Sequence, residues 1–198
     1  RIHIMENTAN KNTVNPAKVI TGVCRLSYAN IWQAKSINGG APKYSASVLI
    51  PKSDTKTLAK VKAAIQAAYE EGEGKLKGNG KTAPSLASLK TPFRDGDTER
   101  PDDEAYAGHW FINANSNTAP GVVDANREPI YDTSEIYSGV YARVSLSFYA
   151  FNSNGNRGIA CALQNIQKVR DGEALGGKSK AEDDFNDNFT SDDGGFLN

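Results

Sequence analysis

The stretch Gly139-Val-Tyr-Ala-Arg-Val-Ser-Leu-Ser-Phe-Tyr-Ala-Phe151 alternates regularly between apolar side chains and side chains of mixed character. This period of two is typical of a strand with one face toward a core. A second strand-like run, Arg157 to Val169, follows after Asn152-Ser-Asn-Gly-Asn156, which predicts a hairpin loop. The even-numbered positions would form the core face: Val140, Ala142, Val144, Leu146, Phe148 and Ala150.

The odd-numbered positions of the same run carry Tyr141, Arg143, Tyr149 and Phe151, which we call the tyrosine platform. An exposed sheet face with rings and a guanidinium suits a surface where bases stack on the rings and the cation meets phosphate. The pattern equally fits a face that a helix or loop covers, with the aromatic rings in a core. Further cations lie toward the ends of the platform or could extend it: Arg157, Lys168, Arg170, Lys43 and Arg25.

Upstream of the hairpin the sequence predicts two strands and one helix. The strands are Lys18–Trp32 and Lys43–Ile50, separated by the turn signal Asn38-Gly-Gly40. In the second strand the apolar side chains share one face, while Lys43 and two serines share the other. The helix would begin at Ser53 as its N-cap and end at Gly72 or Gly74. Its apolar stripe is Leu58, Val61, Ile65, Ala68 and Tyr69.

A further strand is predicted at Tyr106–Asn113. Trp110 and Phe111 would point to opposite faces of it, so that at least one is core and the other, for which we favour Trp110, is a candidate for stacking. The order of several strands, one helix and several more strands lacks the alternation of a parallel α/β sheet. We therefore expect a mainly β fold with one inserted helix, an OB-fold-type antiparallel barrel with long loops.

Charge is divided unevenly along a chain whose 23 basic and 23 acidic residues cancel. Residues 171–198 hold eight acids and two bases, a net charge of −6, which leaves +6 on residues 1–170. A basic body suits a polyanionic partner, and an acidic tail can cover the body's own nucleic-acid surface or bind a basic partner. The alternative is a solvated end that only aids solubility.

Three parts are therefore expected. They are an N-terminal extension over residues 1–17, a folded domain over 18–170, and a flexible acidic tail over 171–198. Arg1–Ile4 precede the only methionine and are expected to be vector-derived. No apolar run long enough to span a membrane and no secretory leader is visible. Cys24 and Cys161 lie in strand-like segments, which favours reduced, buried thiols.

Motifs for catalysis are incomplete. Gly80-Lys-Thr82 resembles the end of a phosphate-binding loop, but a helix precedes it and Pro84 follows, whereas the motif needs a strand before and a helix after. The acids between Asp95 and Glu104 allow a metal-dependent nuclease in principle, although an exposed acidic turn is favoured. His109 is the only histidine after the first methionine, so neither a zinc set nor a serine or cysteine nucleophile with its base is predicted.

Several longer segments, in this order, resemble a known family. They are Pro92-Phe-Arg-Asp-Gly-Asp97, Tyr106-Ala-Gly-His-Trp-Phe-Ile-Asn-Ala-Asn115, Pro120-Gly-Val-Val-Asp124, Tyr137-Ser-Gly-Val-Tyr-Ala-Arg-Val-Ser145, Phe148-Tyr-Ala-Phe-Asn152, Asn154-Gly-Asn-Arg-Gly-Ile-Ala-Cys161 and Leu175-Gly-Gly-Lys-Ser179. Together they span roughly residues 15–185 and resemble the bacteriophage single-stranded DNA-binding proteins, which have an OB-fold core and an acidic C-terminal tail.

The resemblance implies sequence-tolerant binding of single-stranded DNA in phage replication, recombination and repair, in the cytoplasm of the infected bacterial host, with no catalytic residue and no cofactor or metal. The residues expected at DNA are Tyr141, Arg143, Tyr149, Phe151, Arg157, Trp110, Lys43, Arg94 and Lys168. The tail would compete with DNA and bind replication or recombination proteins through Asp183, Asp184, Phe185, Asp187, Phe189, Asp192, Asp193 and Phe196.

Other partners and activities stay open at this point. Duplex DNA and a second copy of the chain are further candidate partners, and no membrane is expected. The alternatives are a single-strand annealing recombination protein, a metal-dependent nuclease, and a structural or carbohydrate-binding β-protein.

Overall fold

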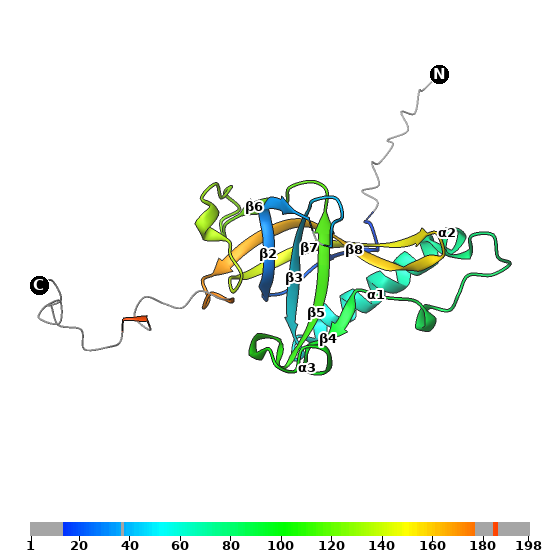
Figure 1. Cartoon of the computed structure of the whole chain (residues 1–198), viewed down its shortest axis with the longest axis horizontal. Coiled ribbons are helices and arrows are strands. Elements are labelled where there is room, and N and C mark those ends of the chain that lie inside the picture. Colours follow the sequence, from blue (N-terminus) through cyan, green and yellow to red (C-terminus); the bar gives the residue numbers. More distant parts are fainter. Residues whose placement is uncertain (1–13, 37, 177–183, 186–198) are drawn as a thin grey trace, which may run out of the picture.

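The computed structural model describes residues 14–36, 38–176 and 184–185, and its longest elements form a hairpin of β7 (Tyr141–Ser153) and β8 (Asn156–Arg170). The even-numbered positions from 140 to 150 are all buried, as the alternation predicted. The end of the hairpin projects beyond the barrel, beside the helices (Figure 1).

The connection between these strands is tighter than the five-residue loop expected from the sequence. Ser153 pairs directly with Asn156, which leaves a two-residue turn. Asn154 and Gly155 both have positive φ, 52° and 86°. Asn-Gly is the favoured pair for such a turn because both residues tolerate the left-handed region, and the turn's twist matches that of the strands.

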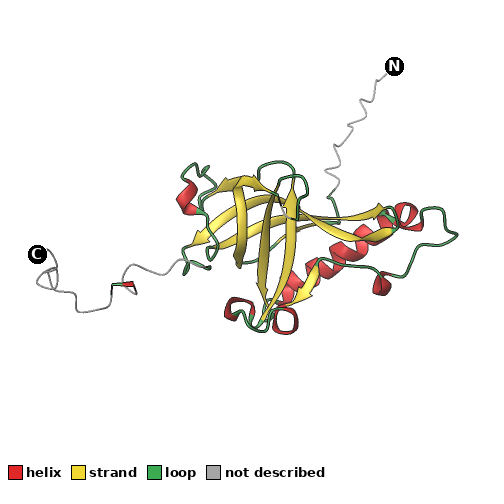
Figure 2. Cartoon of the chain, viewed as in Figure 1, coloured by secondary structure: helices red, strands yellow, loops and turns green. Residues whose placement is uncertain are grey.

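Five strands close into a barrel (Figures 1 and 2). β2 (Cys24–Lys35) pairs with β3 (Lys43–Pro51), β3 with β5 (His109–Ser116), β5 with β8, β8 with β7, and β7 again with β2. This order confirms the predicted barrel of the OB type. Most of these pairs are antiparallel, as expected, while β5 and β8 run parallel.

Three short strands extend the barrel. β1 (Lys18–Ile20) pairs with β7, β4 (Phe93–Asp95) with β5, and β6 (Gly121–Val123) runs parallel to β8. The single strand expected over Lys18–Trp32 is therefore two strands, β1 and β2. The chain breaks between them because the Gly22 backbone lies against the start of the helix, where its N–H donates to Thr57 Oγ1 at 2.9 Å.

Helix α1 (Thr55–Glu71) begins one residue later than predicted. Asp54, not Ser53, is the N-cap, since its Oδ1 accepts a hydrogen bond from the Thr57 N–H and its Oδ2 accepts one from the Thr57 hydroxyl. The apolar stripe of the helix packs into the same core cluster as the even-numbered residues of β7. At its end Gly72 lies so close to β7 that a methyl group in place of its hydrogen would come within 2.2 Å of the Ala150 Cβ.

The remaining helical elements are short and were not predicted. They are α2 (Glu73–Lys77), α3 (Gly96–Glu99) and the 3-10 turns Leu86–Ser88, Glu104–Tyr106 and Thr133–Glu135. Among the described residues no helix is both long and apolar enough to cross a membrane. Cys24 and Cys161 are buried and unbridged, and burial raises the pKa of both thiols, that of Cys24 to about 12.

Candidate nucleic-acid interface

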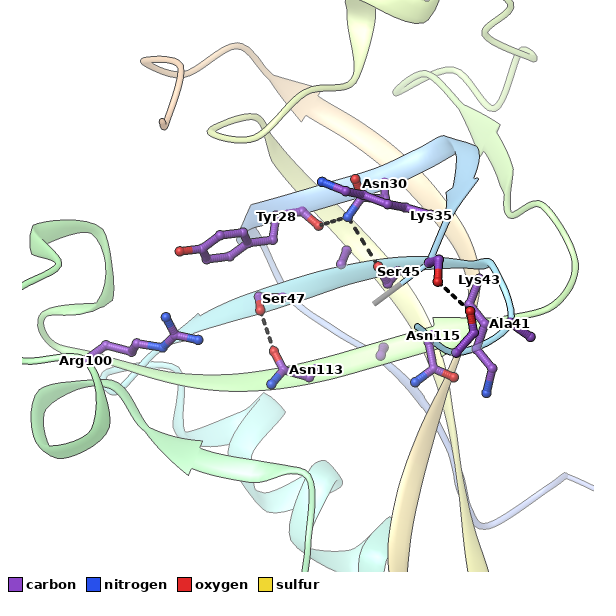
Figure 3. Close-up of a pocket in the computed structure, with 14 residues that line it drawn as sticks. Tyr28, Asn30, Lys35, Ala41, Lys43, Ser45, Ser47, Arg100, Asn113 and Asn115 are labelled. Carbon is purple, nitrogen blue, oxygen red and sulfur yellow. Dashed lines mark hydrogen bonds between the residues drawn. The ribbon is translucent and has the colours of Figure 1, made fainter. Parts of the chain in front are cut away.

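A hollow of about 1000 Å³ lies on the outer face of β2, β3 and β5, and we call it the groove (Figure 3). Its charged side chains are all basic, which gives the groove a positive character. The residues that line it are Tyr28, Asn30, Lys35, Ser36, Gly40, Ala41, Lys43, Ser45, Ala46, Ser47, Arg100, Asn113, Ala114 and Asn115.

Tyr28 owes its position to a bulge in β2. Ser27 pairs with Ser47 and Asn30 with Ser45, so β2 uses one residue more than β3 between these two pairs. Tyr28 has φ of +47°, a region that bulky residues rarely adopt. Bulges re-aim side chains, and backbone strain of this kind often marks functional sites. Here the ring is 57% exposed at the edge of the groove.

Two lysines face each other at the other end of the groove. Lys35 of β2 and Lys43 of β3 form a cross-strand pair, and both side chains are exposed. Like charges directly opposite each other destabilise a sheet, so this pair has a cost in the free protein. An anion between or beside the two ammonium groups would remove that repulsion.

Arg100 supplies the third cation, from the loop after α3. Its guanidinium carbon lies 5.6 Å from the ring centroid of Tyr28 and 5.6 Å from that of Tyr106. Tyr106 is wholly buried and packs edge-on against Phe111, with the ring centroids 5.0 Å apart. The buried rings of Tyr106 and Phe111 therefore hold Arg100 beside Tyr28, at the edge of the groove where Tyr28 lies.

Serine and asparagine side chains make up the floor. Ser47 donates to Asn113, and the Asn30 amide donates to Ser45 Oγ at 3.4 Å (Figure 3). Short polar groups of this kind leave room for an extended chain and can bond to many acceptors and donors. An aromatic ring, three cations and a polar floor form a surface that suits a flexible polyanion carrying planar groups.

The tyrosine platform is divided by the structure. Its Tyr149 end is open, with Tyr149 43% exposed and Phe151 half-buried. Arg143, two residues from Tyr141, is exposed, but its guanidinium donates to the Thr21 carbonyl at 3.2 Å and to Gln167 Oε1 at 3.4 Å. Helix α1 does not cover this face, because α1 packs on the opposite, even-numbered side of β7. The alternative in which a helix covers the odd-numbered face of β7 is therefore excluded for α1.

The Tyr141 end is closed. Arg170 lies 4.1 Å and Arg25 5.4 Å from the Tyr141 ring centroid. The start of the C-terminal segment also crosses here, since a side chain at Gly172 would meet the Tyr141 ring at 2.8 Å. Tyr141 is thus half-buried among arginines and backbone, so the two alternatives for this face each describe one end of the platform.

Most of the cations expected at DNA have partners within the protein. Lys168 forms ion pairs with Glu135 at 2.5 Å and Asp171 at 2.8 Å, and its side chain is only 13% exposed. Arg94 pairs with Glu99 at 2.8 Å. Arg157 donates to the Leu76 carbonyl at 2.9 Å and thereby ties α2 to the hairpin. Of the predicted DNA-contacting residues, Lys43 lies in the groove.

Neither ring of the Trp110–Phe111 pair lies in the groove. Trp110 stacks on Phe93 with the centroids 4.6 Å apart, and the ammonium group of Lys52 lies 5.0 Å from the Trp110 centroid. Phe111 points to the other side and is buried against Tyr106. Phe111 is thus the core member of the pair, as expected, while Trp110 is half-exposed beside Phe93 and stays a candidate for stacking.

The acids of the Asp95–Glu104 segment serve as caps and ion-pair partners. Asp95 caps α3, Asp103 caps the following turn, and Lys52 pairs with Asp95 and Asp97 at 2.8 and 2.7 Å. The hydrogen bonds from Lys52 hold the pKa values of Asp95 and Asp97 below the usual range. Within the described part of the chain, no cluster of three His, Cys, Asp or Glu residues could hold a metal ion.

The tail residues expected to bind partners lie mostly outside the described residues. These are Asp183, Asp187, Phe189, Asp192, Asp193 and Phe196. Asp184 and Phe185 are described, and both are exposed.

A family model described as the ssDNA-binding protein of Enterobacter phage Enc34 matches residues 17–197. The chain belongs to this family. Protein p50 of Acyrthosiphon pisum secondary endosymbiont phage 1 is 33% identical to this chain over 168 residues. The match covers 82% of this chain and 89% of p50.

Two solved structures share the fold of this Enc34-family chain. The single-stranded DNA-binding protein of bacteriophage Enc34, solved in complex with ssDNA, is 24% identical with a TM-score of 0.67; the match covers 81% of this chain and 90% of that one. The gp2.5 single-stranded DNA-binding protein of bacteriophage T7 is 15% identical with a TM-score of 0.57, over 82% of this chain and 97% of gp2.5.

Most residues that line the groove in this Enc34-family chain were not predicted from the sequence. Asn113 and Asn115 alternate with Ile112 and Ala114, so a longer strand prediction would have placed both amides on one outer face. Tyr28 carries no such signal, because the bulge that exposes it depends on pairing with β3.

Proposed function

We propose that this chain binds single-stranded DNA without sequence preference and that the groove on β2, β3 and β5 is its binding site. The observation that carries the proposal is the groove's combination of the bulged Tyr28, the facing lysines Lys35 and Lys43, and Arg100, in a member of the Enc34 family. Tyr28 stacks a base, the cations neutralise phosphates, and the polar floor accommodates any base.

Stacking is the reason for a preference for single strands. A duplex keeps its bases paired and stacked on one another, so it cannot offer a base face to Tyr28, whereas its phosphates remain available to the cations. Single strands should therefore bind more tightly than duplex at equal salt, and both affinities should fall as salt rises.

The decisive experiment is a titration of fluorescent oligo-dT and a matched duplex with the protein at low and moderate salt. Tyr28→Ala should weaken binding to the single strand by roughly 1–3 kcal/mol, the usual value of one stacked base. Tyr131→Ala is the matched control, since Tyr131 is 86% exposed and does not line the groove. Equal binding of both ligands, or no effect of Tyr28→Ala, would remove stacking in the groove from the proposal.

The protein acts as a binder and not as an enzyme in this proposal. The Asp95 and Asp97 carboxylates, which the nuclease alternative needs, are engaged by Lys52. Incubating labelled strands with the protein and Mg²⁺ or Mn²⁺ should leave them intact, and shortened strands would favour the nuclease. Pairing of complementary strands by the protein would instead indicate an annealing activity.

The proposed setting is phage DNA replication and recombination in the cytoplasm of an infected bacterium. The acidic C-terminal residues would screen the groove in the free protein and bind replication or recombination proteins once DNA displaces them. This part is supported by the charges, −6 on residues 171–198 against +6 on the rest. A chain ending at Gly176 should bind DNA more tightly at low salt, and unchanged affinity would argue against screening.

A further inference from the structure

The outer surface of the barrel continues past the groove onto the β7–β8 hairpin. Asn115 of β5 pairs with Ala162 of β8, and Ala162 pairs with Ser147 of β7. Directly paired side chains lie on the same side of a sheet. Because Asn115 lines the groove, Ala162 and Ser147 also face outward, and all three are half-exposed. A strand leaving the groove at Asn115 meets this surface next.

Tyr149 is the first large side chain along β7 on that surface. It lies two residues after Ser147, on the same face, and is 43% exposed. Its cross-strand partner is Ala160, which is too small to cover the ring. The next residue on this face, Phe151, stands over Gly158, where a methyl group would come within 3.1 Å of the ring. The aromatic face of Tyr149 therefore opens outward.

Cations lie on both sides of Tyr149. Lys18 of β1 pairs with Ser147 and is exposed. On the other side Lys90 bridges to Gly158, with its ammonium group 3.4 Å from Asn156 Oδ1. Lys90 and Asn156 also line a second hollow of about 360 Å³ at the tip of the hairpin. The surface around Tyr149 thus resembles the groove, because both have an exposed aromatic ring with cations beside it.

We propose that a single strand bound in the groove continues across Ala162 and Ser147 and stacks a further base on Tyr149, with Lys18 and Lys90 beside its phosphates. This inference rests on the proposed function and adds a second subsite to it. From β3 to β7 there are three strand spacings of about 4.8 Å, and Tyr149 lies about 7 Å along β7 from Ser147. The path from Ser45 is therefore about 20 Å, roughly six stacked nucleotides at about 3.4 Å each.

The test compares oligo-dT of about 4 and about 12 nucleotides, both within the footprints known for OB folds. The 4-nucleotide strand fills the groove only, and the longer one reaches Tyr149. Tyr149→Ala should lower the affinity for the longer strand at least about fivefold, as expected for one stacked base, and leave the shorter one unchanged. Tyr149→Phe should retain affinity, and Tyr131→Ala should change neither.

Two results would overturn the second subsite: an unchanged affinity of Tyr149→Ala for the longer strand, or an equal loss for both lengths. Tyr28→Ala distinguishes this failure from failure of the groove, because it should weaken both strands. Photo-crosslinking with 5-iodouracil near one end of the longer strand gives an independent readout. A crosslinked peptide containing Tyr149 is expected, and crosslinks confined to groove peptides would contradict the path.

Discussion

The salt dependence of DNA binding offers the sharpest test of the groove, because it counts phosphate contacts. For single strands the slope of log affinity against log salt is about −0.7 for each phosphate neutralised. Lys35, Lys43 and Arg100 line the groove, so three contacts give a slope of about −2.1 from this site. Between about 50 and 200 mM salt, a fourfold change, that slope corresponds to roughly an 18-fold loss of affinity.

The perturbation is the double substitution Lys35→Ala and Lys43→Ala. It should make the slope less steep by about 1.4, whatever the total number of contacts, because two phosphates lose their partners. Removing the facing pair also removes a repulsion between like charges, so the folded state should not be weakened. Polarisation of a labelled strand of about 12 nucleotides, at several salt concentrations in this range, measures the slope.

The matched control is Lys60→Ala with Lys62→Ala. Both lysines are exposed on α1, outside the groove, and their removal changes the net charge by the same amount. An unchanged slope in the groove variant would show that phosphates are bound elsewhere. An equal change in both variants would mean that the overall charge, and not the groove, sets the salt dependence.

Three further predictions concern the barrel. Gly72→Ala should destabilise the protein by roughly 1–3 kcal/mol, because the added methyl group collides with β7. Gly74→Ala meets nothing within 4 Å and should be neutral or stabilise the protein by up to about 1 kcal/mol. Urea denaturation measures both changes in the free energy of unfolding. Leu146→Ala, at a wholly buried position, should cost about 2–5 kcal/mol in the same assay. Cys24 and Cys161 should resist iodoacetamide at pH 8 until the protein unfolds, because their raised pKa values keep the thiols protonated; rapid alkylation of the folded protein would contradict this.

The barrel was predictable because its signals are local. The alternation from Val140 to Ala150 fixes which side of β7 is buried, and the apolar stripe of α1 fixes which side of the helix packs against it. The short elements were missed where tertiary contacts override the pattern. The break between β1 and β2, for example, follows from the contact of Gly22 with Thr57, 35 residues away.

The candidate site was less predictable because its chemistry depends on which remote residues meet. Tyr141 and Tyr149 look alike in the sequence, yet Arg25 and Arg170 enclose the first while Ala160 leaves the second open. Tyr28 gave no signal at all, since only its pairing with β3 creates the bulge. The residue types thus predicted a nucleic-acid partner, whereas the strand pairing decides which aromatic rings are open to stack a base.

The boundary between the folded body and the acidic tail is also decided by tertiary contacts. Its position determines which truncation tests whether the tail screens the groove. Charge alone places the boundary at Asp171, but the chain from Asp171 to Leu175 is bound to the barrel. Tyr137 donates to Asp171 Oδ1 at 2.8 Å, Arg25 donates to the Glu173 carbonyl at 2.6 Å, and the Leu175 N–H donates to the Ser138 carbonyl at 2.8 Å.

Hydrogen bonds from Lys168 and Tyr137 also hold the pKa of Asp171 below its usual range. A chain cut before Asp171 would lose these contacts and expose Tyr141, so a change in DNA affinity could arise from a new aromatic surface as well as from the loss of acids. A cut after Gly176 keeps every one of these contacts and removes six acids and two bases, a net charge of −4. Comparing the two truncations therefore separates the electrostatic effect of the tail from the structural role of its first residues.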